Sequence, residues 1–324
     1  MGRLKELLAS KQVLILHGPL GTELEEMGYD VSGKLWSAKY LLEKPAVIQE
    51  LHEIYLNHGS NILTTSTYQA TIPGLEEAGL TSEQAVAIIR LTVQLAQQAR
   101  EQYWQNLDKA QQAASIYPLI SGDVGPYAAY LADGSEYTGQ YGKVTLEALK
   151  AFHRPRIQLF LEQGIDMLAL ETIPNCLEVQ ALTALLREEF PQVEAYISFT
   201  AQQFGQISDG TPLKQVIAEV EACPQILAVG FNCTKPQLYD GLLTELRKLT
   251  DKPLVTYPNS GEIYDGTTQT WHHSHEGESS LVDQTLKWLD LGAQIVGGCC
   301  RTRPSEIQAL AQAVKQKSSE ARHL

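Results

Sequence analysis

The stretch Ile295-Val296-Gly297-Gly298-Cys299-Cys300-Arg301-Thr302 is typical of a buried strand that ends abruptly, because an apolar run meets two glycines and then two adjacent cysteines. Pro304 follows shortly after and suits the first turn of a helix. A second stretch, Leu227-Ala228-Val229-Gly230-Phe231-Asn232-Cys233-Thr234-Lys235-Pro236, has the same order of apolar run, cysteine, turn and proline. Each stretch therefore indicates a β/α unit with cysteine at the end of its strand.

The chain on either side of these units repeats the same alternation. Strands are predicted at 13–17, 61–67, 117–123, 166–171, 193–200, 226–232, 253–257 and 294–298, and helices at 45–58, 81–107, 144–163, 175–190, 212–222, 236–249, 279–291 and 304–315. Thr81 and Thr211 are expected to cap their helices, and Pro155 to disturb the helix at 144–163. The alternation predicts one (β/α)8 barrel domain, a TIM barrel in the α/β class, over residues 1–324. A doubly wound sheet is the alternative, but no Gly-x-Gly-x-x-Gly motif follows the first strand.

The composition narrows the classes of partner. The chain has 324 residues, a net charge of -13 and no basic stripe, which argues against nucleic acid. No apolar run approaches the roughly 18 residues of a membrane span, and residues 1–12 lack a signal-peptide core. Five cysteines, an odd count, favour a reducing compartment such as the cytoplasm over a disulfide framework.

Three cysteines carry the strongest chemical signal. If the strand ends preceding Cys233 and the Cys299–Cys300 pair face one opening, their thiolates converge, while adjacent cysteines such as 299 and 300 cannot easily pair with each other. Three protein ligands and one open position are the arrangement of a catalytic zinc ion. The alternative is that the three thiols are small buried apolar groups, the role expected for Cys176 and Cys223.

The sequence resembles the homocysteine S-methyltransferase family from Leu14 to Leu310. The resemblance rests on Gly21-Thr22-Glu23-Leu24, Glu171-Thr172-Ile173-Pro174, Gly230-Phe231-Asn232-Cys233-Thr234, Tyr257-Pro258-Asn259-Ser260-Gly261-Glu262 and Gly297-Gly298-Cys299-Cys300. Further motifs, among them Leu131-Ala132-Asp133-Gly134-Ser135-Glu136-Tyr137, resemble the branch that uses S-methylmethionine or S-adenosylmethionine. The resemblance implies a (β/α)8 barrel that holds Zn²⁺ through Cys233, Cys299 and Cys300 and methylates homocysteine to methionine.

The resemblance also implies substrate contacts. Glu171 would hold the substrate ammonium group, and Asn259 would lie at the zinc ion and fill its fourth position when substrate is absent. The alternatives are a structural carboxylate and a turn-forming asparagine. His17 departs from the family, which usually has Asp there to help bind the amino group, so amine recognition and acceptor identity are open. His17→Asp is expected to lower the KM for homocysteine.

Aromatic and acidic loop residues are candidates for binding the methyl donor. Trp36, Tyr127, Tyr130 and Trp271 could pack against a sulfonium by cation–π contact, although ordinary loop packing is the alternative for each. Glu136 could offset the donor's charge, although an exposed loop carboxylate is the default. The cluster His272, His273 and His275 is expected to be a solvated loop rather than a second metal site. The long loops at 124–142 and 258–278 that carry these residues are expected on the catalytic face.

A zinc site would solve a definite chemical problem. A free thiol with a pKa near ~8.5 is mostly protonated at neutral pH, and coordination to zinc would deprotonate it. The rivals are betaine as donor, another thiol or selenol as acceptor, and a non-catalytic zinc- or thiol-sensing barrel. The preferred donor and the oligomeric state are open.

Overall fold

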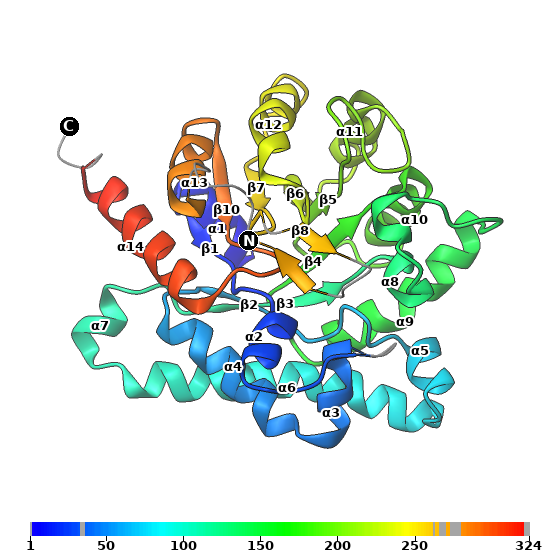
Figure 1. Cartoon of the computed structure of the whole chain (residues 1–324), viewed down its shortest axis with the longest axis horizontal. Coiled ribbons are helices and arrows are strands. Elements are labelled where there is room, and N and C mark those ends of the chain that lie inside the picture. The colour runs from blue at the N-terminus through cyan, green and yellow to red at the C-terminus, as the bar shows by residue number, and fades with distance from the viewer. Residues whose placement is uncertain (1, 33–35, 262, 266–269, 273–279, 321–324) are drawn as a thin grey trace.

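The structure is a closed barrel of parallel strands surrounded by helices (Figure 1). The computed structural model describes residues 2–32, 36–261, 263–265, 270–272 and 280–320. The barrel strands are β1 Leu14–Ile15, β2 Ile62–Thr64, β3 Leu119–Val124, β4 Met167–Ile173, β5 Ala195–Phe199, β6 Ile226–Asn232, β7 Leu254–Tyr257 and β10 Ala293–Val296. Their order is β1-β10-β7-β6-β5-β4-β3-β2, and a parallel bridge between Leu16 and Ile62 joins the two ends. The predicted (β/α)8 barrel is confirmed.

The predicted helices form the outer ring of Figure 1. They are α4 Pro45–Asn57, α6 Ser82–Asn106, α9 Leu146–Glu162, α10 Cys176–Glu188, α11 Leu213–Glu221, α12 Tyr239–Arg247, α13 Leu281–Asp290 and α14 Pro304–Glu320. Thr81 caps α6 in a capping box with Gln84, as expected. The expected cap by Thr211 is wrong, because Pro212 occupies the cap position of α11. Pro155 does not interrupt α9, whose buried face on both sides of the proline holds the helix against the barrel.

Short elements occupy the connections and were not predicted. They are α1 Arg3–Ala9, α2 Leu20–Glu26, η1 Trp36–Lys39, α3 Tyr40–Glu43, α5 Ile72–Glu77, α7 Lys109–Ala113, α8 Tyr127–Leu131, η2 Ser135–Tyr137, η3 Pro236–Leu238 and a hairpin of β8 Ile263–Asp265 and β9 Thr270–His272. Most have too few turns for a helical period to show in the sequence. Helix α1 matters for the barrel, because Leu4 and Leu8 are buried in the core inside its strands.

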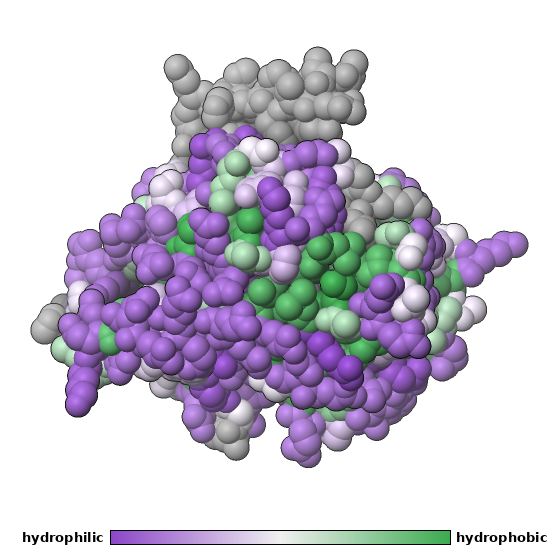
Figure 2. Space-filling model, turned by 90° about the horizontal axis from the view of Figure 1, so that it is seen from below, coloured by the Kyte–Doolittle hydropathy of each residue, from purple (hydrophilic) through white to green (hydrophobic). Residues whose placement is uncertain are grey.

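Two hydrophobic cores result from the alternation of side chains along each strand. The inner core contains, among others, Leu14, Leu119, Met167, Ala228 and Ile295, and the outer core fills the space between strands and helices. The face in Figure 2 is mostly hydrophilic, with an apolar area near its centre. In the part of the chain that the structure describes, no helix combines the length and apolar character required to cross a bilayer.

Candidate active site

A cavity of about 980 Å³ lies at the carboxyl ends of the barrel strands. It is lined by residues that lie in or follow all eight barrel strands: His17 after β1, Thr65 after β2, Asp123 in β3, Glu171 in β4, Tyr196 in β5, Cys233 after β6, Asn259 after β7 and Cys299 after β10. Its volume is at the upper end of the range of small-molecule sites, so an acceptor and a donor can occupy it together. The loops at 124–142 and 258–278 both contribute to its wall, as expected, through Glu136, Tyr137, Asn259 and Gly261.

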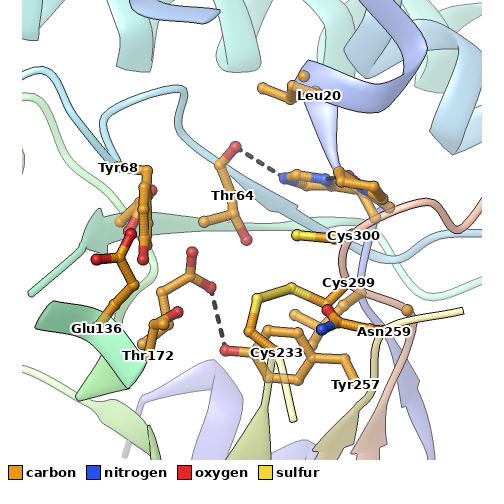
Figure 3. A pocket seen from close by; sticks show the side chains of 18 of the residues that line it. Leu20, Thr64, Tyr68, Glu136, Thr172, Cys233, Tyr257, Asn259, Cys299 and Cys300 are labelled. Atoms are coloured by element: carbon orange, nitrogen blue, oxygen red, sulfur yellow. Dashed lines mark hydrogen bonds between the residues drawn. A yellow bond between two sulfur atoms is a disulfide. The ribbon is translucent and has the colours of Figure 1, made fainter. Parts of the chain in front are cut away.

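The three predicted cysteines come together at this cavity, with their sulfur atoms within 4.8 Å of one another (Figure 3). Strand β7 is the reason, because it pairs with β6 on one side and β10 on the other. The amide of Cys233 donates to the carbonyl of Tyr257 (3.3 Å), and the amide of Cys299 donates to the carbonyl of Pro258 (2.7 Å). Two cysteines 66 residues apart thus form backbone hydrogen bonds to the consecutive carbonyl groups of Tyr257 and Pro258.

Cys233 and Cys299 form a disulfide, whereas Cys300 has a free thiol. This bond differs from the sequence-based expectation of three free thiols. The adjacent pair 299 and 300 is not bonded, as expected. Burial raises the pKa of Cys300 to about 11, so the thiol stays protonated at neutral pH without a cation beside it.

The cluster fits a metal ion once the disulfide is reduced. Two thiolates that bind one zinc ion at about 2.3 Å each are at most about 4.6 Å apart. The three sulfurs here all lie within 4.8 Å of one another, and two of them are bonded, so reduction leaves them within reach of one ion. The carboxamide oxygen of Asn259 is buried without a hydrogen-bond partner among the described residues and lines the cavity beside the cysteines (Figure 3). A soft sulfur donor set with an unpartnered oxygen nearby suits zinc better than magnesium or calcium.

Backbone strain accompanies the site. Cys233 has φ 45° and Thr172 has φ 62°, in the left-handed region that non-glycine residues rarely adopt. The buried side chain of Asn232 holds Thr172 there, because its Oδ1 accepts from the Thr172 amide (2.9 Å) and its Nδ2 donates to the Thr172 hydroxyl (2.7 Å). A Cβ at Gly298 would lie 2.3 Å from the Thr302 side chain, so the tight turn before the paired cysteines requires glycine.

Glu171 points into the cavity from β4. The hydroxyl of Tyr257 donates to Glu171 Oε2 (3.0 Å), and Ser198 contacts the same hydroxyl at 2.6 Å. Burial raises the pKa of Glu171 to about 7, although the Tyr257 bond opposes the shift. Asp123, which was not among the predicted site residues, lines the same cavity from the neighbouring strand β3. The signal that identified Glu171, an acid at the end of an apolar run, applied to Asp123 too.

His17 lines the cavity but has no free acceptor for an amino group. Its Nε2 lies 2.9 Å from the Thr64 carbonyl oxygen, and its Nδ1 contacts the Gly18 carbonyl oxygen. Burial lowers the pKa of His17, and behind it the ring of His52, 5.9 Å away, is buried with its pKa lowered to about 3. Both nitrogens of His17 thus face backbone oxygens.

Tyr127 does not join the other predicted substrate contacts. Its ring packs against Tyr130, Tyr141 and Phe152 outside the set of cavity-lining residues, and its amide donates to the buried carboxylate of Glu178 (2.6 Å). The expectation that Tyr127 or Tyr130 faces a substrate is therefore replaced by ordinary loop packing, since Glu178 anchors this loop. The aromatic ring that does line the cavity nearby is Tyr68, beside Glu136 (Figure 3).

Several predictions fall outside the described residues. These are His273 and His275 entirely, and the side chains of Trp36, Trp271 and His272. Ser37, next to Trp36 in η1, lines the cavity. Glu136 has one carboxylate oxygen buried without a hydrogen-bond partner among the described residues, and burial raises its pKa.

A barrel that gathers three cysteine sulfurs and three carboxyl groups at one mouth has the features of a methyltransferase that acts on a thiol. The sequence profile of homocysteine S-methyltransferases matches residues 14–314, and the chain belongs to this family of enzymes. It is 45% identical over 307 residues to the homocysteine S-methyltransferase of Escherichia coli (strain K12), covering 95% of this chain and 97% of that protein. It is 42% identical over 301 residues to the selenocysteine Se-methyltransferase of Brassica oleracea var. italica, covering 91% and 87%.

The fold comparison agrees with the sequence comparison. The crystal structure of the homocysteine methyltransferase MmuM from Escherichia coli in its metallated form superposes with a TM-score of 0.84 at 41% identity, covering 95% of this chain and 99% of that one. The oxidized form of the same enzyme gives the same TM-score and covers 97% and 99%. That enzyme thus exists in both a metallated and an oxidized form, while the present structure has two of its three clustered cysteines oxidised.

Proposed function

We propose that this protein transfers a methyl group from S-methylmethionine, or from S-adenosylmethionine, to homocysteine at a zinc ion held by Cys233, Cys299 and Cys300. The observation that carries the proposal is the convergence of the three sulfurs at the cavity. We further place the protein in the cytoplasm, where a reducing environment keeps such cysteines as thiols.

The reaction itself is a displacement at carbon. A new bond forms between the acceptor sulfur and the methyl carbon as the bond from that carbon to the donor sulfonium breaks, and the donor leaves as a neutral thioether. The acceptor's thiol proton is released to solvent. When bound, a zinc ion would supply the Lewis acidity that deprotonates the acceptor thiol. The leaving group needs no acid catalysis, so the protein mainly has to align the reacting atoms.

The cavity residues have distinct roles in this proposal. Glu171 would bind the ammonium group of the acceptor, held in place by its bond from Tyr257. Asn259 would occupy the metal's open position when no thiol is present, which accounts for its unpartnered oxygen. Across the cavity from the cysteines, Tyr68 and Glu136 offer an aromatic face and a carboxylate to the cationic donor (Figure 3). Trp36 remains a proposed donor contact on the strength of its sequence motif.

A direct assay tests this function. Reduced protein loaded with one equivalent of zinc is incubated with homocysteine and each sulfonium, and methionine is quantified. Methionine formation that stops on chelation and returns with zinc supports the proposal. Turnover that persists after complete metal removal contradicts the role of zinc. Zinc binding without turnover on any sulfonium favours a sensing role.

A selenol or another thiol as acceptor is the second candidate. Two observations favour testing it: His17 stands where the family resemblance leads one to expect Asp, and a relative at 42% identity is named for selenocysteine. Selenocysteine and homocysteine compared at equal concentration with the same donor would decide between them. A higher kcat/KM for selenocysteine would reassign the acceptor and leave the metal site unchanged.

A further inference from the structure

Asp123 is a buried acid that lies in the cavity wall without a cation bonded to it. Its side chain is only 3% exposed, and it lines the cavity near the end of β3. Its Oδ1 is buried and has no hydrogen-bond partner in the described parts of the chain. A buried carboxyl group normally has its oxygens satisfied, because an unpaired one costs free energy. An oxygen left open at a cavity therefore indicates a donor that arrives with a ligand.

The neighbouring cation does not fill this position. Arg156 is a buried residue of α9, and its guanidinium donates to the carbonyl oxygens of Thr67 (3.1 Å) and Gly125 (2.7 Å) instead. Burial and the neighbouring Glu171 raise the pKa of Asp123 well above its usual range, while Arg156 and a hydrogen bond from the Gly125 backbone only partly oppose the shift. This is the behaviour of an acid whose charge the protein itself does not fully neutralise.

The sheet register places Asp123 beside Glu171. Asp123 is opposite Ala169, and Glu171 is two residues further along β4, on the same inward face. Two carboxyl groups on adjacent strands thus face the same part of the cavity. A primary ammonium group has three donors and one positive charge, so it can satisfy two carboxylate oxygens and offset their repulsion.

Residue 17 cannot supply this second carboxylate. Both nitrogens of His17 contact backbone carbonyl oxygens, so the ring has no lone pair directed at the cavity for an ammonium group. Asp123 is the second acid, after Glu171, that lines the cavity from a buried position in a barrel strand.

We infer that Asp123 is a specificity-determining residue that binds the α-ammonium group of the amino-acid acceptor together with Glu171. The inference rests on the proposed function and deepens it, because it assigns amine recognition to the third strand. The barrel then distinguishes an amino-acid thiol from an otherwise identical thiol that lacks the amino group.

The test compares two acceptors in two variants. Homocysteine and 4-mercaptobutanoate differ only by the amino group, and Asp123→Asn changes the charge without changing the shape. Asp290→Asn, on the exposed end of α13, is the matched charge control, because its partner Lys317 lies on the surface. We expect Asp123→Asn to raise the KM for homocysteine about 10- to 100-fold with little change in kcat. The same variant should leave the KM for 4-mercaptobutanoate unchanged. Asp290→Asn should change neither KM.

Two outcomes would overturn the assignment. One is a homocysteine KM within twofold of the unaltered protein, and the other is an equal rise for both acceptors, which would indicate a packing role. Calorimetric binding of each acceptor to the zinc-loaded protein gives a second readout that does not depend on turnover. If the unaltered protein fails to methylate homocysteine, the proposed function fails. The affinity ratio between the two acceptors, with and without Asp123→Asn, still confirms or refutes the recognition of the amine.

Discussion

Replacing Glu171 with glutamine is expected to stabilise the ligand-free protein while impairing its function. The glutamine side chain keeps the shape of the original and can still accept from Tyr257, but it has no charge to bury. Burial raises the pKa of Glu171 from 4.5 to about 7, which corresponds to about 3 kcal/mol of unfolding free energy. Because the carboxyl group faces an open cavity, we expect solvent screening to reduce this to about 2 kcal/mol.

The direction in which the unfolding free energy changes with pH follows from proton binding. A carboxyl group whose pKa is raised by folding binds its proton more tightly in the native state. Its stabilising contribution is complete below pH 4.5 and is lost as the pH rises through about 7. Glu171→Gln has no carboxyl group at this position, so its unfolding free energy does not fall in this way as the pH rises. The difference in unfolding free energy between Glu171→Gln and the unaltered protein should therefore be small near pH 5 and reach about 2 kcal/mol in favour of the variant near pH 8.

Urea denaturation of metal-free protein at pH 5, 6, 7 and 8 measures this difference. Glu50→Gln, at an exposed position of α4, is the control and should show no such pH dependence. In parallel, the KM for homocysteine should rise at least tenfold at pH 8 in Glu171→Gln, because one ammonium partner is lost. A stability gain equal at pH 5 and pH 8, or a destabilised variant at pH 8, would refute the reasoning.

Three further predictions concern the cysteines, the strained backbone and the amine site. Denatured protein should show three reactive thiols before reduction and all five after it, and the folded protein should bind one zinc ion only after reduction. Cys300→Ser should keep the disulfide but no longer bind zinc. Zinc binding before reduction would contradict the ligand set. Asn232→Ala should lower the unfolding free energy by about 2 kcal/mol in urea, because it removes both bonds that hold Thr172 in its left-handed conformation; a loss below about 0.5 kcal/mol would show that other contacts hold it. In a protein that already carries Asp123→Asn, His17→Asp should lower the homocysteine KM again by about tenfold, and an unchanged KM would mean that residue 17 does not reach the ammonium group.

The barrel could be predicted because its signals are long and repeated. Every barrel strand contains an apolar run, and the principal helices begin at recognisable residues such as Pro45 and Thr81. The features that were predicted wrongly, or not at all, are short elements or single positions. Thr211 was assigned the cap that Pro212 occupies, and α1 has only seven residues, too few for its apolar positions to stand out. Its role in closing the barrel depends on tertiary contacts that the sequence pattern does not encode.

The site was only partly predictable for a similar reason. Cysteines at the ends of two strands indicated the cysteine cluster, because parallel strands in a barrel present their carboxyl ends at one face. The disulfide was not predictable, since it depends on the distance between the Cys233 and Cys299 sulfurs, which the strand pattern does not give. Asp123 was overlooked because an acid followed by Val-Gly-Pro was treated as the end of a strand rather than as part of a cavity wall. Tyr127 was assigned to the cavity by its loop, but the direction of a loop side chain depends on contacts such as that with Glu178.

Helix α1 has a consequence for the movement of substrates and products. Leu4 and Leu8 are buried in the core inside the barrel, and the cavity is lined by residues at the other end, near the carboxyl ends of the strands. We therefore expect the acceptor, the donor and both products to pass through the same opening of the cavity. A product that lingers there blocks the next round of catalysis, so product inhibition should be competitive against both incoming molecules.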